Sequence, residues 1–259
     1  MRFGRNDDAV PDFAPAADVA LVTGAAVRIG RAIALELASR GHAVAIHCHT
    51  SVEQAEQTAA DCRERGAADV AIVRGDLAVA ADCRRIVAET ADRLGHPTVL
   101  VNSAAIFEAD SLATMTDESW SRHQAINLVA PLRLMQAVCT GRDERQSVIN
   151  IVDWRAERPP PGHLSYTLSK AGLTAATELL AQELAPRVRV NGIAPGPMLP
   201  PPGEDDSYLD RVAATIPLRR AGSAEAIAHA VGYLLDADFV TGHILHVTGG
   251  QEFQGRSEG

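Results

Sequence analysis

The chain has 259 residues, a length that can bury a full core as a single α/β domain. Its formal net charge of -9 argues against nucleic acid or an anionic membrane as the main partner, while leaving room for a local basic pocket that binds a phosphate. The four cysteines form no C-x-x-C pair, and residues 1–17 lack the apolar stretch of a signal peptide. We therefore expect a cytoplasmic protein with reduced thiols, no membrane span and no metal site.

Short apolar runs alternate with longer amphipathic stretches along the chain. The runs, each a predicted strand, cover 19–22, 43–46, 70–73, 99–101, 148–152, 188–193 and 244–247. The stretches, each a predicted helix, cover 28–40, 52–65, 80–94, 117–139, 163–184 and 223–235. This alternation is typical of βαβ units, and the wholly apolar strands indicate a sheet covered on both faces. We predict an α/β fold, a Rossmann-like doubly wound parallel sheet of about seven strands with helices on both faces.

The pattern contains no linker that divides it. We therefore expect one domain over residues 1–259, with its core at about 18–250 and loose tails at both ends. Two proline- and glycine-rich loops, 158–162 and 196–206, follow the fifth and sixth predicted strands. Ligands of open α/β sheets bind beyond the carboxyl ends of strands, so these loops are interpreted as a substrate rim and a lid. Two stiff surface loops are the alternative.

The segment from Thr23 to Gly30 follows the first predicted strand and opens the first predicted helix. Glycines let the backbone turn tightly and approach a pyrophosphate, and the helix dipole favours that anion. The predicted contacts with the nucleotide are Gly24, Arg28, Ile29 and Gly30.

The second predicted strand ends without the acidic residue that holds the ribose diol of NAD. Arg28 lies in the loop expected to face the same ribose, and a guanidinium can bind a 2′-phosphate bidentately. We therefore predict NADP(H) as cofactor, with His47, His49 and Ser51 at the ribose. Ser51 can instead only cap the next helix, and a metal bound by the two histidines would lack a third ligand at a plausible spacing.

Two further segments after strands are candidate nucleotide contacts. Asp76 and Leu77 resemble a pair that contacts adenine, and Asn102, Ser103 and Ala104 place small residues beside the dinucleotide. Turn formation explains each of these segments equally well.

Tyr166 and Lys170 stand at i and i+4 on one face of a predicted helix. An ammonium beside a phenol favours the phenolate, so we expect Lys170 to lower the pKa of Tyr166 towards neutrality. Such a phenol is a proton donor usable near pH 7.

Together with Asn127 and the Asn-Gly-Ile-Ala-Pro-Gly segment at 191–196, these motifs resemble the short-chain dehydrogenase/reductase family from about residue 18 to 250. The resemblance implies hydride transfer from a nicotinamide, with Tyr166 as acid. It implies that Lys170 holds the ribose, that Asn127 holds a water in a proton relay, and that Pro195 and Gly196 contact the cofactor. It also implies a homotetramer, and a small-residue face on the Tyr166 helix suits such packing, although packing on its own sheet explains that face equally.

Asp153 stands thirteen residues before Tyr166, where the family pattern has a serine. This departure resembles the pteridine reductase and dihydromonapterin reductase branch, as do Arg28, the histidines at 47 and 49, and Phe107. By that resemblance Phe107 stacks on a pterin opposite the nicotinamide, and Trp154 lines the pocket. For both aromatic residues, a place in the core is the plain alternative.

An ionised aspartate only accepts hydrogen bonds, so beside a developing alkoxide it would repel. Asp153 therefore suits a ring with N–H donors whose nitrogen gains a proton, although burial can also hold the carboxyl protonated. We expect an NADPH-dependent reductase of a C=N bond in a dihydropteridine. The alternatives are a ketone or 3-oxoacyl reductase of the same fold, a non-catalytic NADP-binding sensor, and a site that has lost its activity.

Overall fold

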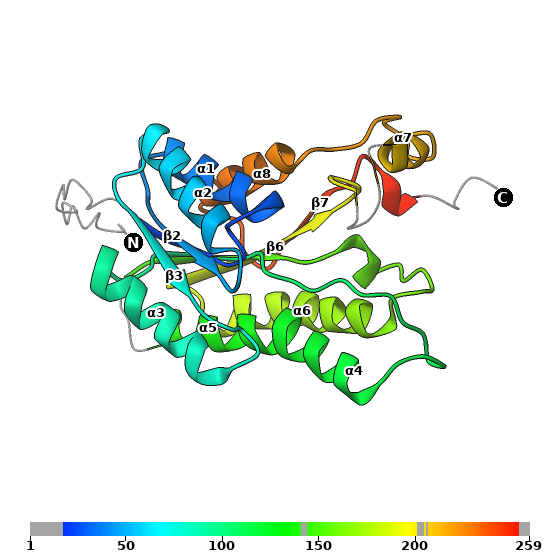
Figure 1. The fold of residues 1–259 in the computed structure, drawn as a ribbon, viewed down its shortest axis with the longest axis horizontal. Coiled ribbons are helices and arrows are strands. Elements are labelled where there is room, and N and C mark those ends of the chain that lie inside the picture. The colour runs from blue at the N-terminus through cyan, green and yellow to red at the C-terminus, as the bar shows by residue number, and fades with distance from the viewer. Residues whose placement is uncertain (1–17, 141–143, 201–204, 206, 254–259) are drawn as a thin grey trace, which may run out of the picture.

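The computed structural model describes residues 18–140, 144–200, 205 and 207–253. The tails expected at both ends, and much of the expected lid after the sixth strand, lie outside the described residues. The described part contains a seven-stranded sheet of order β3-β2-β1-β4-β5-β6-β7, in which every pair of neighbours is parallel (Figure 1). The predicted fold class is confirmed.

All seven predicted strands form. They are β1 (Val19–Val22), β2 (Ala43–Cys48), β3 (Val70–Arg74), β4 (Val99–Asn102), β5 (Gln146–Ile151), β6 (Val188–Pro195) and β7 (Ile244–Val247). Every residue of β1, β2, β4 and β5 is buried. Continuous apolar runs gave the right assignment here because a parallel sheet with both faces covered has no solvent-facing side.

The predicted helices form with one interruption. They are α1 (Arg28–Ser39), α2 (Val52–Glu64), α3 (Ala80–Leu94), α4 (Asp117–Gln124), α5 (Ala130–Cys139), α6 (Leu164–Glu183) and α8 (Ala224–Asp236). The helix expected over 117–139 is divided into α4 and α5 by a π-helical turn, η1 (Ala125–Val129). A further helix, α7 (Ser207–Ala213), follows the expected lid in a segment for which no helix was predicted.

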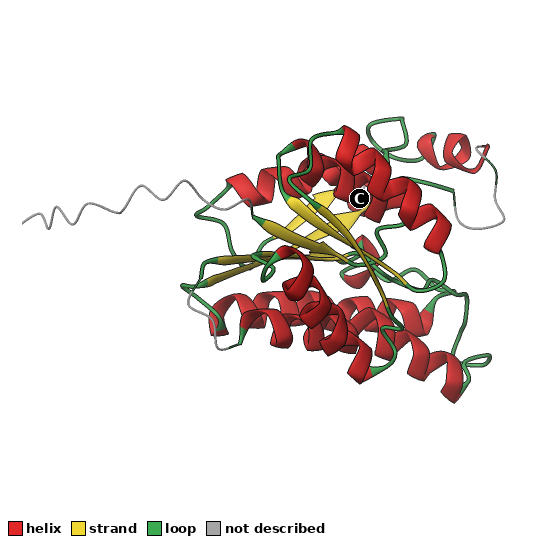
Figure 2. Ribbon diagram, turned by 60° about the vertical axis from the view of Figure 1, so that its left-hand side comes forward, coloured by secondary structure: helices red, strands yellow, loops and turns green. Residues whose placement is uncertain are grey.

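The helices cover both faces of the sheet. Helices α1, α2 and α8 lie on one face, and α3, α4, α5 and α6 lie on the other (Figures 1 and 2). Each layer encloses its own apolar cluster, one built around α1 and α8 and one around α3 and α5. No helix of the described residues is long and apolar enough to cross a membrane.

The direction of the strand order reverses between β1 and β4, and ligands of open α/β sheets bind in the crevice at such a point. Thr23 joins the two strand ends there, since its Oγ1 accepts from the backbone N–H groups of Ser103 and Ala104, at 3.0 Å each. The loop after β1 is thereby fixed beside the loop after β4.

Candidate active site

Tyr166 and Asp153 meet directly at the carboxyl end of the sheet. Asp153 follows β5, and its Oδ1 accepts from the backbone N–H of Arg155 at 2.8 Å, which begins the short 3-10 turn η2 (Trp154–Ala156). The Tyr166 hydroxyl, carried by α6, donates to Asp153 Oδ2 at 2.7 Å. Both side chains are buried. The structure therefore joins Tyr166, the predicted acid, and Asp153, the residue that replaces the serine of the family pattern, in one hydrogen-bonded pair.

The pKa of Tyr166 lies well above the usual value of 10.0, because burial, the Asp153 charge and the Asp153 hydrogen bond all oppose its ionisation. The expectation that Lys170 lowers this pKa is wrong for the structure as it stands. The Lys170 ammonium is 5.9 Å from the centre of the Tyr166 ring, whereas the carboxylate touches the hydroxyl itself. The phenol is therefore held firmly protonated.

Lys170 is buried behind Tyr166 on α6, as its spacing predicted. Its Nζ donates to the backbone oxygen of Ile151 at the end of β5, at 2.7 Å. Burial lowers the pKa of Lys170 to about 8, with the Asp153 charge acting in the opposite direction. The ammonium group is thus bound to the Ile151 backbone near Tyr166 and Asp153, and it does not contact the phenol oxygen.

Asn127 lies in the π-helical turn η1 and is wholly buried. Its amide exchanges hydrogen bonds with the backbone of Ile106, accepting at 2.9 Å and donating at 3.0 Å, and it also donates to Ser169 Oγ at 3.1 Å. The side chain therefore joins the β4 loop to α6. The predicted hold of Asn127 on a water stays a prediction.

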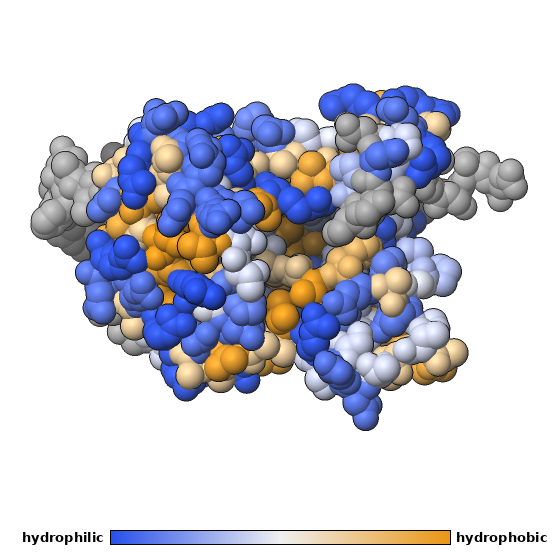
Figure 3. All heavy atoms as spheres, viewed as in Figure 1, coloured by the Kyte–Doolittle hydropathy of each residue, from blue (hydrophilic) through white to orange (hydrophobic). Residues whose placement is uncertain are grey.

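A cleft of about 370 Å³ opens in front of the catalytic pair. The space-filling view shows a hollow in this face of the molecule with apolar residues around it (Figure 3). Side chains from the β4, β5 and β6 loops, from the start of α1, from α6 and from α7 line the cleft, among them Arg28, Phe107, Asp153, Trp154, Arg155, Tyr166, Lys170, Met198, Leu199 and Tyr208. The loop expected to form a lid contributes lining residues, whereas none of the lining residues comes from 158–162, the loop expected to form a substrate rim.

Phe107 lies at the mouth of this cleft, within reach of the catalytic pair. Its ring stacks on His163, with 4.1 Å between ring centres, and meets Tyr166 edge-on at 4.7 Å. The guanidinium of Arg155 lies over the Phe107 ring at 5.4 Å and over the Trp154 ring at 5.3 Å. Sequence reasoning missed Arg155, although its place two residues after Asp153 was a usable signal.

His47 fixes the position of the glycine loop through a hydrogen bond to Gly24. Its Nδ1 accepts from the Gly24 backbone N–H at 3.2 Å, and its Nε2 donates to the Gly75 backbone oxygen at 3.1 Å. Burial lowers the pKa of His47 to about 4, so the ring is neutral at pH 7. His47 is buried, and both of its ring nitrogens are hydrogen-bonded to these backbone groups. Instead of the expected contact with the ribose, its side chain fixes the position of Gly24.

The start of α1 fits a pyrophosphate. Gly24 has a φ of +64°, and a Cβ on Gly30 would lie 2.2 Å from the Gly24 oxygen, so glycine is required at both positions. The residue that caps α1 is Val27, whose side chain has no acceptor for the first N–H groups of the helix. Those donors and the dipole are the features that favour a phosphate group beside Ile29 and Gly30.

Arg28 lies in the glycine loop, as expected, and its contact with the 2′-phosphate stays a prediction. It has a φ of +55°, lines the catalytic cleft, and donates from Nη2 to the Pro200 backbone oxygen at 2.8 Å. A second guanidinium lies beside the end of β2: Arg74 pairs in register with Cys48 of β2 and donates to the His49 backbone oxygen at 2.9 Å. Arg74 was not predicted as a candidate, because its place beside His49 depends on the pairing of β3 with β2.

The other predicted nucleotide contacts occupy the same edge of the sheet. His49 is exposed at the end of β2, and Ser51 precedes α2 without a capping hydrogen bond from its side chain among the described residues. Asp76 Oδ1 accepts from Ala78 N–H at 2.9 Å, which is turn chemistry, and Leu77 is buried in the apolar core. The adenine assignment is therefore not supported by Leu77.

The β4 and β6 ends complete that edge. Asn102 is buried and donates to Asn150 Oδ1 at 2.8 Å, while Ser103 lines the catalytic cleft. Ala104 packs so closely against Gly24 that a Cβ on this glycine would lie 2.9 Å from the Ala104 Cα. Pro195 and Gly196 close β6 and also line the cleft.

Comparisons with known proteins agree with this geometry. Residues 24–252 match the family model described as enoyl-(acyl carrier protein) reductase. The chain belongs to the short-chain dehydrogenase/reductase family. It is 37% identical over 247 residues to a Streptomyces violaceoruber granaticin polyketide synthase protein named as a ketoacyl reductase, covering 92% of this chain and 97% of the relative. It is 36% identical to the 3-oxoacyl-[acyl-carrier-protein] reductase FabG of Pseudomonas aeruginosa, covering 90% and 96%.

Solved structures of similar proteins carry the cofactor that the sequence predicted. FolM alternative dihydrofolate reductase 1 from Brucella canis, complexed with NADP, superimposes with a TM-score of 0.85 at 38% identity, covering 92% of this chain and 95% of that one. A metagenomic blue fluorescent protein complexed with NADPH superimposes with a TM-score of 0.83 at 32% identity, covering 90% and 97%. The chain is thus an NADP-dependent oxidoreductase of this family.

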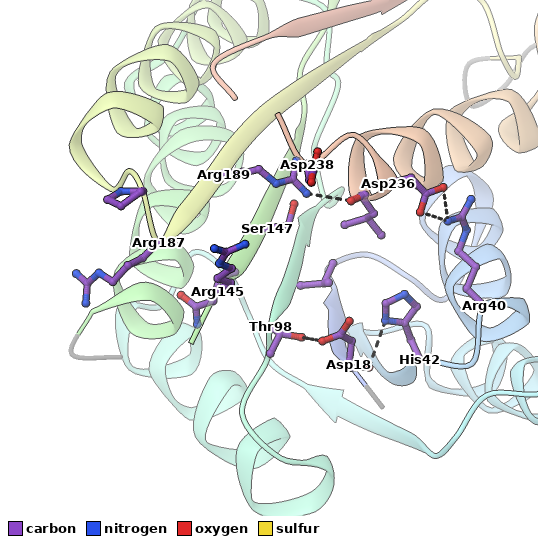
Figure 4. Close-up of a pocket in the computed structure, with 14 residues that line it drawn as sticks. Asp18, Arg40, His42, Thr98, Arg145, Ser147, Arg187, Arg189, Asp236 and Asp238 are labelled. Carbon is purple, nitrogen blue, oxygen red and sulfur yellow. Dashed lines mark hydrogen bonds and ion pairs between the residues drawn. The ribbon is translucent and has the colours of Figure 1, made fainter. Parts of the chain in front are cut away.

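A second cleft of this reductase, of about 480 Å³, lies at the opposite edge of the sheet (Figure 4). Its charges are largely paired within the protein, since Arg40 binds Asp236 and Thr98 donates to Asp18, while Arg189 donates to backbone oxygens at the end of α8 and just after it. These contacts join strand starts to α1 and α8, far from Tyr166. Among the described residues, no group of three or more His, Cys, Asp or Glu side chains could hold a metal ion.

Proposed function

We propose that this protein is an NADPH-dependent reductase of a C=N bond in a dihydropteridine. The observation that carries the proposal is the hydrogen bond of 2.7 Å from the Tyr166 hydroxyl to Asp153 Oδ2. It places a carboxylate against the proton donor, at the point where a reducible bond must lie. The choice of substrate therefore follows from what a carboxylate tolerates there.

A carbonyl gains negative charge on oxygen as hydride arrives at its carbon. The Asp153 carboxylate would repel that charge in a buried site, where charges interact strongly. A C=N bond gains its electron pair on nitrogen and takes up a proton there, and a pteridine also carries N–H groups that a carboxylate can accept. The arrangement favours such a ring over a ketone.

Other steps of the proposed reaction, which are cofactor binding, proton donation and substrate orientation, are assigned to individual residues. When bound, NADPH supplies the hydride. Tyr166, held protonated at its hydroxyl, is the donor for the substrate nitrogen, and Asp153 orients that hydroxyl while accepting from ring N–H groups. Lys170 fixes the end of β5 next to the pair through the Ile151 oxygen, and as a cation it suits the ribose hydroxyl groups of the cofactor. The glycine loop and the start of α1 hold the phosphates.

The walls of the cleft suit a flat heterocycle. Phe107 and Trp154 offer aromatic surfaces, Met198 is an adaptable apolar neighbour, and Arg28 and Arg155 bring cations that stack on rings. The likeness to FolM alternative dihydrofolate reductase 1, at 38% identity, supports a pteridine as the substrate class.

A ketone or 3-oxoacyl group is the second candidate substrate. It is supported by the relatives named as ketoacyl and 3-oxoacyl-[acyl-carrier-protein] reductases, at 37% and 36% identity. Asp153 weighs against it for the electrostatic reason given above. A non-catalytic NADP-binding sensor is disfavoured by the paired Tyr166 and Asp153, which a sensor would not require.

The test is a substrate panel with NADPH, followed at 340 nm as the cofactor is consumed. The panel contains a dihydropterin, dihydrofolate, a quinone, a simple ketone and a 3-oxoacyl thioester. Turnover of a dihydropteridine with the largest kcat/KM supports the proposal. A larger value for the thioester or the ketone assigns the second candidate, and NADPH binding without any turnover assigns a sensor.

We further propose that the protein acts as a homotetramer, as its family resemblance implies. Ala171, Ala175 and Ala176 leave a low, partly exposed stripe on α6, which would let a second copy approach closely, whereas Gly172 packs against Leu128 of its own chain. Sedimentation equilibrium tests this, and a monomer at micromolar concentration would contradict it.

A further inference from the structure

Arg155 occupies the place where a substrate ring would lie. Its side chain is 22% exposed, and its guanidinium lies over both Phe107 and Trp154. Its Nη1 lies 3.5 Å and 3.3 Å from the two Asp153 oxygens. The guanidinium is thus a flat, N–H-bearing group that covers the open aromatic wall and faces the catalytic carboxylate.

The pairing of Arg155 with Asp153 is poorly made. Charge-assisted N–H···O bonds are usually about 2.7–2.9 Å long, and a good arginine pair uses two parallel N–H groups. Here a single nitrogen reaches both oxygens at 3.3 Å and 3.5 Å, and the buried Nε has no hydrogen-bond partner among the described residues. A better partner for the carboxylate would therefore displace this guanidinium at little cost.

Asp153 has room for such a partner. Its Oδ1 receives one short hydrogen bond, from the Arg155 backbone at 2.8 Å, and its Oδ2 receives one from Tyr166 at 2.7 Å. Each carboxylate oxygen can accept about two hydrogen bonds, so one acceptor position remains on each oxygen, filled only by the long contacts of Nη1. Two parallel N–H donors would fill both positions.

We propose that Arg155 is an internal stand-in, a group that every substrate of this site must displace from Asp153. The proposal rests on the proposed function, because a pterin contains a guanidine unit within a flat ring and presents N–H donors much as arginine does. A ring with such donors regains both the Asp153 bonds and the Phe107 surface. A substrate without N–H donors regains only the surface. The cost of displacing Arg155 is the same for both substrates, so the ring with N–H donors offsets that cost better.

The first test compares Arg155→Ala with the unmodified enzyme on a dihydropterin, on dihydrofolate and on a ketone. If Arg155 covers the site about nine-tenths of the time, its removal lowers the KM of each substrate that binds there about 10-fold. Arg158→Ala is the matched control, since Arg158 follows on the same loop and is not among the residues that line the cleft. An unchanged or raised KM in Arg155→Ala overturns the proposal. If the KM rises only for dihydrofolate, which bears carboxylates, Arg155 instead binds the anionic tail of that substrate.

The second test does not depend on turnover. Methylguanidine should occupy the vacated place in Arg155→Ala and change the fluorescence of Trp154 in a saturable way. The chain has 2 tryptophans, so the measurement uses a Trp120→Phe background, with NADP⁺ present throughout. The unmodified protein and Arg158→Ala should show no saturable change at the same concentrations. Binding by Arg155→Ala without pterin turnover would leave this inference standing and refute only the proposed function; absence of binding overturns the inference.

Discussion

Tyr166 and Asp153, thirteen residues apart in the chain, share a hydrogen bond of 2.7 Å between the phenol hydroxyl and the carboxylate Oδ2. The carboxylate raises the pKa of Tyr166 both by its charge and by accepting this bond, in addition to the effect of burial. The pair therefore stores the proton on the phenol. Changes to either partner should alter both proton supply and substrate choice.

Replacing Asp153 should change substrate preference. Asp153→Ser should lower kcat/KM for a dihydropterin by about 10²-fold or more, because a charge-assisted interaction is lost, while turnover of a simple ketone holds or rises. Asp153→Asn keeps the shape and removes the charge, so it should damage pterin turnover nearly as much. Steady-state kinetics of the three proteins on both substrates decide this. A native preference for the ketone, reduced in Asp153→Ser, would refute the pterin assignment.

Removing the phenol hydroxyl should abolish proton donation and spare the fold. Tyr166→Phe should lower kcat by about 10²–10⁴-fold, the usual effect of losing a general acid. NADP⁺ affinity is the control and should stay near the native value, since the phosphate-binding loop is untouched. Turnover close to that of the unmodified enzyme would mean that another group supplies the proton.

Cofactor selection should depend on Arg74 more than on Arg28. Arg74 lies across from the end of β2, where the ribose is expected, whereas Arg28 lines the catalytic cleft. We expect NADPH to bind at least about 10-fold tighter than NADH, equivalent to about 1.4 kcal/mol, and Arg74→Ala to remove most of that ratio. Arg28→Ala is the matched comparison. If only Arg28→Ala loses the preference for NADPH over NADH, then Arg28 binds the 2′-phosphate, as predicted from the sequence.

Acid should destabilise the protein through His47. The pKa of His47 falls from 6.5 to about 4 on burial, and the Nδ1 that accepts from Gly24 is lost as an acceptor when the ring is protonated. The unfolded chain therefore binds more protons than the folded one between these values. The stability due to neutral His47 is fully present above pH 6.5 and is lost as the pH falls towards 4, by up to about 1.4 kcal/mol per pH unit.

The measurement compares the unfolding free energy of the native protein with that of His47→Gln in urea from pH 7 to 4. Glutamine keeps a donor and an acceptor but does not titrate, so titration of the carboxylates largely cancels in the difference. A difference that does not change with pH would show that His47 keeps its ordinary pKa.

Titration of Lys170 should change the free energy of unfolding in the alkaline pH range. Burial lowers its pKa from 10.5 to about 8, so between these values the unfolded chain holds a proton that the folded chain has lost. The unfolding free energy of the native protein, measured relative to Lys170→Met, should therefore rise from pH 8 to 10, by up to about 1.4 kcal/mol per pH unit. Denaturant unfolding of both proteins at each pH checks this. A flat or falling difference would place the ammonium in a solvated site.

The sequence alone was sufficient for the features that repeat or lie close together in the chain. Alternating apolar runs predicted every strand, because a sheet covered on both faces admits few polar residues. The i, i+4 spacing placed Tyr166 and Lys170 on one helix. The absence of an acid after the second strand predicted NADP, and the cofactor of similar solved structures agrees.

Only the tertiary structure decided the electrostatics and the direction of the side chains. The pKa of Tyr166 depends on whether a carboxylate or an ammonium is nearer to its hydroxyl, and the spacing of Lys170 could not reveal the Asp153 contact. Arg28 lines the cleft and donates to the Pro200 backbone oxygen, and Arg74 reaches the end of β2 because β3 pairs with β2. Coulombic and hydrogen-bond energies fall steeply with distance, and such distances between segments remote in sequence are set by the packing of the whole sheet.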